Sequence, residues 1–273
     1  MTPYPNLISK SLLINDAIDF VRSLGGQASA VSIVDFVMKI RNPEPRLACL
    51  LVAELIAPDP RLVLNGDMVE FIPDTFDDRE LTATEFVVFD LETTGAKAPP
   101  CRITEIGAYR VKNGEVAEKF QTLVNPEMPI PWFISQLTGI TDEMVRDAPL
   151  FEEIALDFLE FIGHSVLVAH NSGFDMRFLN YEIGRIFPDY RVANPCLCTV
   201  KLSRRLLPDI VNHKLKTVAE HYDIDLVNHH RASADAYATA HIFVNLLTRL
   251  SDDGVNDLAS VRQISSRKKP YVR

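Results

Sequence analysis

The sequence has few cysteines, no long apolar run and no excess of basic residues. Its four cysteines are too few for a disulfide scaffold, and no CxxC pair indicates a zinc knuckle, so reduced and buried thiols are expected. No run approaches the roughly 20 apolar residues that span a bilayer. The N-terminus lacks the basic segment and apolar core of a secretory signal. We therefore expect a cytoplasmic protein with no membrane partner.

The charge balance is acidic, because 37 Asp and Glu residues stand against 28 Lys and Arg residues, a formal net charge of −9. Proteins that coat nucleic acid are normally basic, so tight, non-specific nucleic-acid binding by the bare protein is not expected. An enzyme that acts on nucleic acid stays compatible with this charge, since metal ions can supply positive charge at a phosphate. The hydrophobic share of 47% is ordinary for globular chains and excludes a disordered or collagen-like protein.

The length of 273 residues favours two modest domains. An acidic stretch without apolar periodicity, residues 75–83, predicts a linker between them. The linker separates an N-terminal domain, residues 1–74, from a larger domain, residues 84–250. Residues 251–273 are expected to form a C-terminal tail that carries a small basic patch at 267–270.

The N-terminal domain has helical patterns at 17–21, 33–38 and 46–56 and two short strands, 61–64 and 68–72, around the turn signal Asn65-Gly66-Asp67. Three helices followed by a hairpin are similar to a winged helix-turn-helix, whose third helix reads the DNA major groove. Here the third helix carries only Arg46 and Glu54 as charged residues, and residues 1–82 hold 7 basic and 12 acidic residues. Because phosphate binding requires positive charge, we expect this domain to contact the second domain or a protein partner rather than DNA.

The larger domain alternates strands and helices. Strands are predicted at 86–89, 102–111, 115–124, 166–169 and 193–200, and helices at 151–162, 174–186, 214–221 and 232–250. This order predicts an α/β fold, a sheet with helices on its faces.

Two carboxylates stand at the end of the first predicted strand of this domain. Asp90 and Glu92 are two positions apart, so in a strand they point to the same face. An acidic pair beside buried Val and Phe residues is costly unless a cation neutralises it. Taken alone, the pair also fits an ordinary solvated strand end.

Two further carboxylates have a similar placement. Asp175 falls at the start of a helix, where it also fits a helix cap, and Asp235 lies on the helix 232–250, five residues after His230. Spacing alone leaves the choice between His229 and His230 open. Together the four carboxylates offer hard oxygen ligands, which suit Mg²⁺ or Mn²⁺ rather than zinc.

Three strings in this order and spacing carry a resemblance to a known family: FDLETTG, AHNSGFD and HHRASADA. They resemble the three motifs of the histidine-bearing branch of the DEDD exonuclease superfamily, which includes the proofreading epsilon subunit of bacterial DNA polymerase III. Further matching pieces are 103–107, 137–140 and 198–199, and the resemblance covers residues 85–250. It implies a ribonuclease H-like fold, a mixed and mostly five-stranded sheet flanked by helices.

The resemblance also implies a metal-dependent removal of nucleotides from a 3′ end. Its catalytic set falls on Asp90, Glu92, Asp175, Asp235 and His230. The four carboxylates would hold two ions, Mg²⁺ or Mn²⁺, and His230 would take the proton of the attacking water. Substrate contacts are expected from Thr93, Thr94, Leu137, Thr138, Asn171 and Phe174.

The expected substrate is a single-stranded 3′ end, with DNA favoured over RNA. RNA stays an alternative, because nothing in the sequence identifies a contact to a 2′-hydroxyl or its exclusion. A second alternative is a winged-helix regulator or scaffold with a secondary nuclease domain, although a pure scaffold would not need the complete acid set. The N-terminal domain is foreign to the polymerase proofreading subunit, so it favours a stand-alone or repair role.

Overall fold

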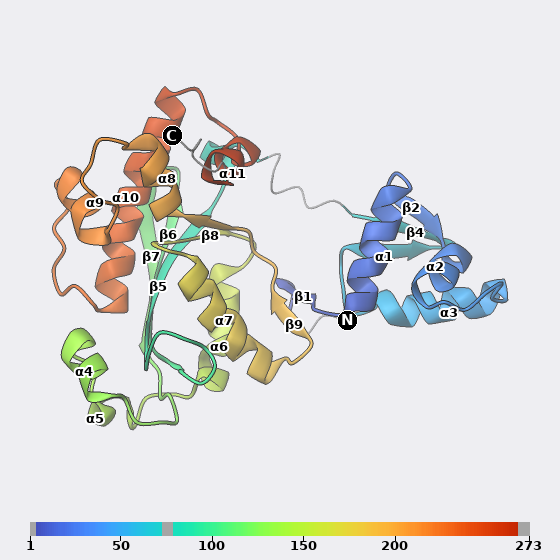
Figure 1. Ribbon diagram of the computed structural model, residues 1–273, viewed down its shortest axis with the longest axis horizontal. Helices are drawn as coiled ribbons and strands as arrows, with labels where there is room; N and C mark the ends of the chain where they lie inside the picture. Colours follow the sequence, from blue (N-terminus) through green and yellow to red (C-terminus); the bar gives the residue numbers. More distant parts are fainter. Residues whose placement is uncertain (1–3, 73–78, 267–273) are drawn as a thin grey trace, which may run out of the picture. The chain divides into compact units, whose positions relative to one another are not determined.

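The computed structural model describes residues 4–72 and 79–266, and the chain divides into two compact units (Figure 1). The first unit comprises Met1–Thr75 together with Ile183–Ala193, and the second comprises Phe76–Glu182 together with Asn194–Arg273. The first boundary falls at the predicted linker, but residues 183–193, which were predicted to belong to the larger domain 84–250, belong to the first unit. None of the helices in the described ranges is both long enough and apolar enough to cross a bilayer.

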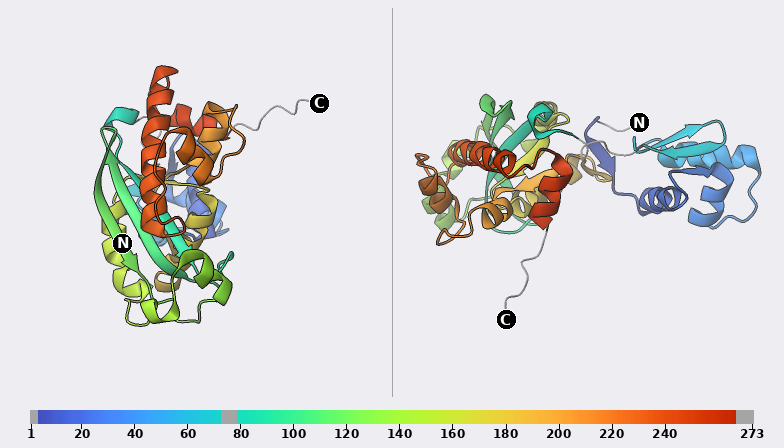
Figure 2. Two further views of the ribbon diagram at one scale, coloured as in Figure 1. Left: turned by 90° about the vertical axis from the view of Figure 1, so that its left-hand side faces the viewer. Right: turned by 90° about the horizontal axis from the view of Figure 1, so that it is seen from above.

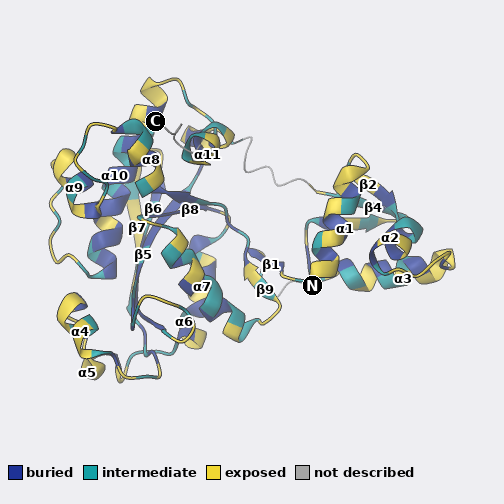
Figure 3. Cartoon of the chain, viewed as in Figure 1, coloured by how far each residue is buried: buried dark blue, intermediate teal, exposed yellow. Residues whose placement is uncertain are grey.

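The second unit is built on a mixed five-stranded sheet with the order β10-β8-β5-β6-β7. Its strands are β5 (Phe86–Thr93), β6 (Ile103–Lys112), β7 (Glu115–Leu123), β8 (Val166–Ala169) and β10 (Cys196–Cys198). Strands β5, β6 and β7 form an antiparallel meander, whereas β8 runs parallel to both β5 and β10. The central strands are buried (Figure 3). The predicted α/β fold and its sheet are confirmed.

The helices of this unit cover both faces of the sheet. They are α4 (Trp132–Thr138), α5 (Asp142–Val145), α6 (Phe151–Ile162), α7 (Gly173–Ile186), α8 (Thr199–Leu206), α9 (Leu215–His221), α10 (Ala232–Asp252) and α11 (Leu258–Ser266). Helix α10 lies along the sheet against β5 and β6 (Figure 2), where the rings of Phe86 and Phe243 meet at 4.9 Å. Helix α6 packs on the opposite face through Phe158, whose ring lies 6.4 Å from that of Phe89.

The last predicted strand is shorter than the sequence suggests. Residues 193–200 were expected to form one strand, but β10 begins at Cys196, and Thr199 already opens helix α8. Pro195 has no amide hydrogen for a sheet ladder, and the Asn194 side chain donates instead to the carbonyls of Gly163 and Ser165. Thr199 and Val200, the β-branched residues at the end of the span, therefore lie in helix α8 rather than in a strand.

The C-terminal assignment also needs correction. Residues 251–273 were expected to form a tail, yet α11 packs against α8 and β10 and buries Leu258 and Val261 in the core. The described end of the predicted linker is likewise folded, because Leu81 is buried and its amide donates to the carbonyl of Asn256. The basic patch at 267–270 and the acidic residues 73–78 lie outside the described residues.

The first unit holds the three predicted helices and the hairpin. Its elements are β1 (Leu7–Ser9), α1 (Leu12–Ser23), β2 (Gln27–Ser29), α2 (Ala30–Val37), α3 (Pro45–Ile56), β3 (Leu62–Asn65) and β4 (Met68–Phe71), with the sheet order β2-β4-β3. Strand β1 pairs with β9 (Tyr190–Val192), which the sequence patterns did not reveal. Helix α3 exposes Leu47 and Leu50 beside Arg46 and Glu54. The likeness to a winged helix stays a prediction.

Candidate functional site

Strand alternation places two acidic side chains on the α10 face of the sheet. Phe86 and Val88 of β5 pack into the core beneath α10, so Asp90 and Glu92, which continue the same alternation, face the same side. Asp235 sits in the first turn of α10 and is 5% exposed. Ligand oxygens of Asp90, Glu92 and Asp235 lie within 4.8 Å of one another. Three of the four predicted acidic ligands therefore converge.

Gly107 allows α10 to reach these acids. It pairs with Asp90 in the β5–β6 register, and its Cα faces the first turn of α10. A Cβ at this position would lie 2.3 Å from the amide nitrogen of Ser233 and 2.4 Å from the carbonyl carbon of Ala232. These backbone atoms cannot move away without shifting the helix, so any larger residue would push Asp235 away from β5.

Glu105 fixes the same helix end and is a residue that sequence reasoning left without a role. It pairs with Glu92 across the β5–β6 ladder and is fully buried. Its carboxylate accepts hydrogen bonds from Nε and Nη2 of Arg231, at 2.9 and 3.0 Å, and from the amide of Ala232 at 3.1 Å. An acid at a helix N-terminus and a two-pronged arginine pair are both favourable. The signal in the sequence was an acid between the apolar residues Ile103 and Ile106 of this strand.

Asp175 reaches β5 from the helix that follows β8. It lies in the first turn of α7, is 2% exposed, and accepts a hydrogen bond from the amide of Leu91. Its charge raises the pKa of Asp90, although burial of Asp90 contributes more. Asp175 is not one of the three acids within 4.8 Å, but it borders the same strand segment.

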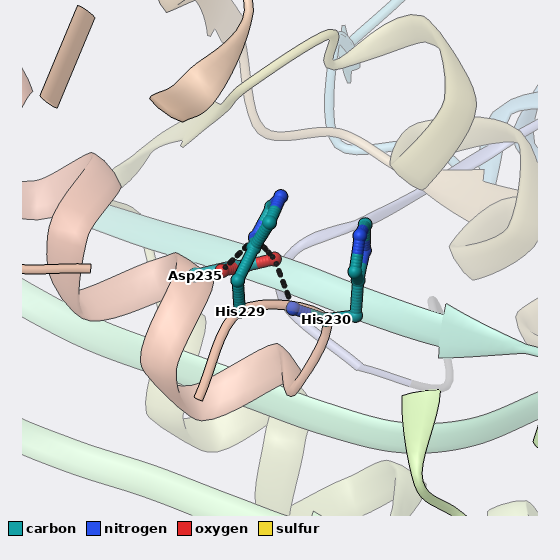
Figure 4. Close-up of side chains that lie close together, drawn as sticks. All are labelled: His229, His230 and Asp235. Atoms are coloured by element: carbon teal, nitrogen blue, oxygen red, sulfur yellow. Dashed lines mark hydrogen bonds and ion pairs between the residues drawn. The ribbon is translucent and has the colours of Figure 1, made fainter. Parts of the chain in front are cut away.

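The two histidines sit on the loop before α10 and play different parts (Figure 4). The ring of His229, through Nδ1, lies 2.9 and 3.0 Å from the two oxygens of Asp235. His230 instead donates its backbone amide to Asp235 at 3.2 Å, and its ring stacks on that of His229 at 3.8 Å. The φ angle of His230 is 67°, a left-handed conformation that costs energy in a non-glycine residue. Asp235 therefore holds this strained turn in place.

The predicted substrate residues fall into two groups. The hydroxyls of Thr93, Thr94 and Thr138 are buried and engaged with Gly95 O, with Arg102 N and with Ile134 O, respectively. Substrate contacts from these three residues would therefore have to come from the backbone. By contrast, Leu137 is 52% exposed, Asn171 is exposed and Phe174 is half-buried. Their contact with substrate stays a prediction.

A comparison with known proteins identifies the family of this chain. A family model described as Exonuclease matches residues 87–243, more than half of the chain. The chain belongs to the exonuclease family. The described residues of the second unit, 79–182 and 194–266, hold the whole carboxylate site and are called the exonuclease domain below.

Curated relatives include PolC-type DNA polymerase III chains. The chain is 43% identical to that of Caldanaerobacter subterraneus over 69% of its own length, and 39% identical to that of Bacillus subtilis over 71%. It spans only 13% and 14% of the lengths of these two relatives. The PolC-type chain of Bacillus cereus is 35% identical over 88% of this chain, a larger share than the exonuclease domain alone contains.

Solved structures share the fold. Exonuclease X in complex with 5′ overhanging duplex DNA is 27% identical, with a TM-score of 0.54, and the match covers 66% of this chain and 99% of that chain. E. coli Exonuclease I in complex with a dT13 oligonucleotide gives a TM-score of 0.56 over 63% of this chain and 42% of that chain. At 19% identity, the second likeness bears on the fold alone. The ribonuclease H-like architecture is thereby confirmed.

The electrostatics of the exonuclease domain show strong repulsion among the acids. Burial, and then the charges of Asp175, Glu92 and Asp235, raise the pKa of Asp90 well above its usual range. Burial, and then Asp235 and Glu105, raise the pKa of Glu92 to about 8. Burial raises the pKa of Asp175 to about 7. Close carboxylates with raised pKa values are the donor set that a hard divalent cation fits, because the cation relieves both the burial cost and the repulsion.

His170 supports the site without titrating near neutral pH. Burial lowers its pKa to about 4, so its ring is neutral. Its Nε2–H donates to the carbonyl of His213 at 3.1 Å, and its Nδ1 lies 2.9 Å from the hydroxyl of Thr199. These bonds join the end of β8 to α8 and to the loop before α9.

We predict that Glu105→Gln lowers the turnover of the exonuclease domain and its Mn²⁺ affinity by about 10- to 100-fold, the usual effect of losing a residue that orients a metal ligand. The amide cannot neutralise Arg231 or accept both of its hydrogen bonds, so the first turn of α10 and Asp235 lose their fixed position. Steady-state kinetics and Mn²⁺ titration of the full chain measure the two effects.

Gln121→Ala is the matched control, because Gln121 is exposed and donates a single hydrogen bond to Glu105, at 3.1 Å. It should change both quantities far less than Glu105→Gln. Wild-type Mn²⁺ affinity and turnover in Glu105→Gln would show that the ion pair does not position the site.

Proposed function

We propose that this protein is a 3′–5′ exonuclease that hydrolyses DNA from single-stranded 3′ ends, in editing or repair. The observation that carries the proposal is the convergence of Asp90, Glu92 and Asp235 within 4.8 Å, with Asp175 beside them. A scaffold would gain nothing from this arrangement, because burying like charges together is costly. Family membership supports the nuclease activity.

Asp90, Glu92, Asp175 and Asp235 would hold two divalent cations, Mg²⁺ or Mn²⁺. Oxygen donors dominate the site, which suits these hard ions. Bound ions of this kind activate water and stabilise a leaving oxygen in phosphodiester hydrolysis. The protein itself contributes the fixed positions of the carboxylates: Asp90 and Glu92 on a central strand, Asp175 and Asp235 in the first turns of two helices.

His230 would act as the general base that takes a proton from the attacking water. Partial burial, and then the neighbouring His229 ring, lower its pKa, which favours the neutral form that accepts a proton. His229 would orient Asp235, because its ring already contacts that carboxylate. The left-handed turn at His230 directs the two rings side by side rather than both toward Asp235.

DNA is the favoured substrate on the strength of the relatives. The PolC-type chains that match this protein are DNA polymerases by name, and Exonuclease X was solved with DNA. The exposed Leu137, at the C-terminal end of α4, would wedge against the terminal base. Asn171 and Phe174, at the start of α7, would contact the DNA strand. The backbones of Thr93, Thr94 and Thr138 would complete the contacts.

The first unit would serve a protein partner rather than DNA. Helix α3 presents Leu47 and Leu50, which are 48% and 68% exposed, with only one basic side chain beside them. Phosphate groups would find little positive charge on this helix, whereas an apolar protein surface could cover the two leucines. The similarity to polymerase chains over 88% of this chain favours an editing role within a larger assembly.

The decisive experiment uses oligonucleotides labelled at the 5′ end, as matched single- and double-stranded DNA and RNA, with Mg²⁺ or Mn²⁺. We expect a ladder of shortened, labelled DNA single strands, because removal from the 3′ end leaves the label on the substrate. EDTA should abolish the ladder, and so should Asp175→Asn, which keeps the shape of the side chain but removes its charge.

Three outcomes contradict parts of the proposal. Immediate release of the labelled nucleotide would show that degradation starts at the 5′ end, which contradicts the proposed 3′–5′ polarity. Faster degradation of RNA than of DNA would assign the alternative substrate. Full activity of Asp175→Asn in Mg²⁺ would remove Asp175 from the ligand set.

The two histidines should separate kinetically. His230→Ala should keep substrate affinity but lose about 10²- to 10⁴-fold in turnover, the usual contribution of proton transfer. His229→Ala should cost less, because it removes only an orienting contact to Asp235. Single-turnover rates at saturating enzyme compare the two variants. A larger loss of turnover in His229→Ala would assign the role of general base to His229 instead of His230.

A further inference from the structure

Helix α4 exposes an aromatic face that the acidic site does not explain. Trp132 is 76% exposed and Phe133 is 63% exposed, although large aromatic side chains usually gain stability from burial. At 100° per residue, Trp132, Gln136, Phe133 and Leu137 follow one another around one side of the helix. The opposite side packs inward, since Ile134 joins a small core cluster and Thr138 is buried. The exposed aromatic face is therefore fixed rather than a frayed end.

This face lies at the end of the sheet that carries the acids. Figures 1 and 2 place α4 beyond the end of β5, where α10 begins. The segment that leads into α4 contacts the same region. The Thr94 hydroxyl donates a hydrogen bond to Met128 Sδ at 3.5 Å, and Thr94 lies two residues after Glu92. Glu127 pairs with the buried Arg102 at 2.9 Å. Leu137 of the same helix is the residue expected to meet the terminal base.

We propose that Trp132 and Phe133 form a stacking platform for the bases just upstream of the 3′-terminal nucleotide. The proposal rests on the exonuclease function proposed above and adds a second contact region to it. From Leu137 to Trp132 the helix rises about 7.5 Å, which corresponds to about two nucleotides at the spacing of a stacked strand. The platform would therefore bind the second and third bases of a single strand.

The charge of the protein favours this occupant and this mode of binding. The net charge is −9 and α4 contains no charged residue, so this helix offers no positive charge to phosphates. Stacking on aromatic rings binds any base and needs no positive charge. A single strand whose bases turn toward α4 and whose phosphates turn to solvent satisfies both conditions. Such binding also tolerates any sequence, as an enzyme that shortens strands stepwise requires.

Trp132 is the only tryptophan of the chain, so its fluorescence reports directly on the platform. Oligothymidylates of two, four and eight nucleotides are titrated into the full chain carrying Asp175→Asn, which prevents cleavage. We expect saturable quenching whose affinity rises from two to four nucleotides and little further. We also expect a weak salt dependence. The slope of log affinity against log salt should be shallower than about −0.7, the value for one phosphate contact on a single strand.

Kinetics in the otherwise native chain separate the platform from the acidic site. Trp132→Ala and Phe133→Ala should each raise KM for the eight-nucleotide strand about tenfold. Both should leave hydrolysis of a small ester, thymidine 5′-monophosphate p-nitrophenyl ester, unchanged. Trp132→Phe should stay close to the wild type on both substrates, whereas Trp132→Leu, apolar but not planar, should resemble Trp132→Ala. Leu156→Ala, which removes a 50% exposed side chain from α6, is the matched control.

Each failure has a distinct meaning. Unchanged KM for the long strand in both alanine variants, or binding without quenching, would overturn the platform and leave α4 to another partner. Equal losses of activity on the eight-nucleotide strand and on the ester would show that Trp132 and Phe133 support the acidic site instead. A wild-type chain that cleaves neither substrate would contradict the exonuclease proposal itself.

Discussion

The carboxylate site depends on how closely the first turn of α10 approaches strand β6. Gly107 leaves room for the backbone of Ala232 and Ser233, and Glu105 holds the helix end through Arg231 and the amide of Ala232. Because Asp235 lies in that turn, this contact sets its distance from Asp90 and Glu92. One methyl group added at Gly107 would push the helix away and separate the acids, so the site is a consequence of helix-to-sheet packing.

The same packing places like charges together at a cost. Burial and mutual repulsion raise the pKa values of Asp90, Glu92 and Asp175, so protons compete with cations for the site. A fold selected only for stability would avoid such a cluster, whereas a site that binds divalent cations requires it. Glu105 adds to the repulsion that Glu92 experiences, but Arg231, which pairs with Glu105 at 2.9 Å, offsets part of this effect.

Local patterns in the sequence predicted most of the sheet and the acids at its strand end. Alternation in β5 alone puts Asp90 and Glu92 on one face. Long-range contacts were beyond such patterns: Glu105 meets Arg231 across more than a hundred residues, and β1 pairs with β9 from the other half of the chain. Likewise, spacing alone left the choice between His229 and His230 open, because the contact of the His229 ring with Asp235 depends on a left-handed turn that no local signal marks.

The most direct test counts the protons released when Mn²⁺ binds, by titration calorimetry of the full chain in two buffers of different ionisation enthalpy. The raised pKa values, about 8 for Glu92 and about 7 for Asp175, leave Glu92 mostly protonated and Asp175 about half protonated at pH 7 without metal, and ligation needs the charged form. We expect release of at least one proton per chain at pH 7, and an affinity that rises from pH 6 to pH 9. Binding at pH 7 without proton release, at an affinity constant over that range, would contradict it.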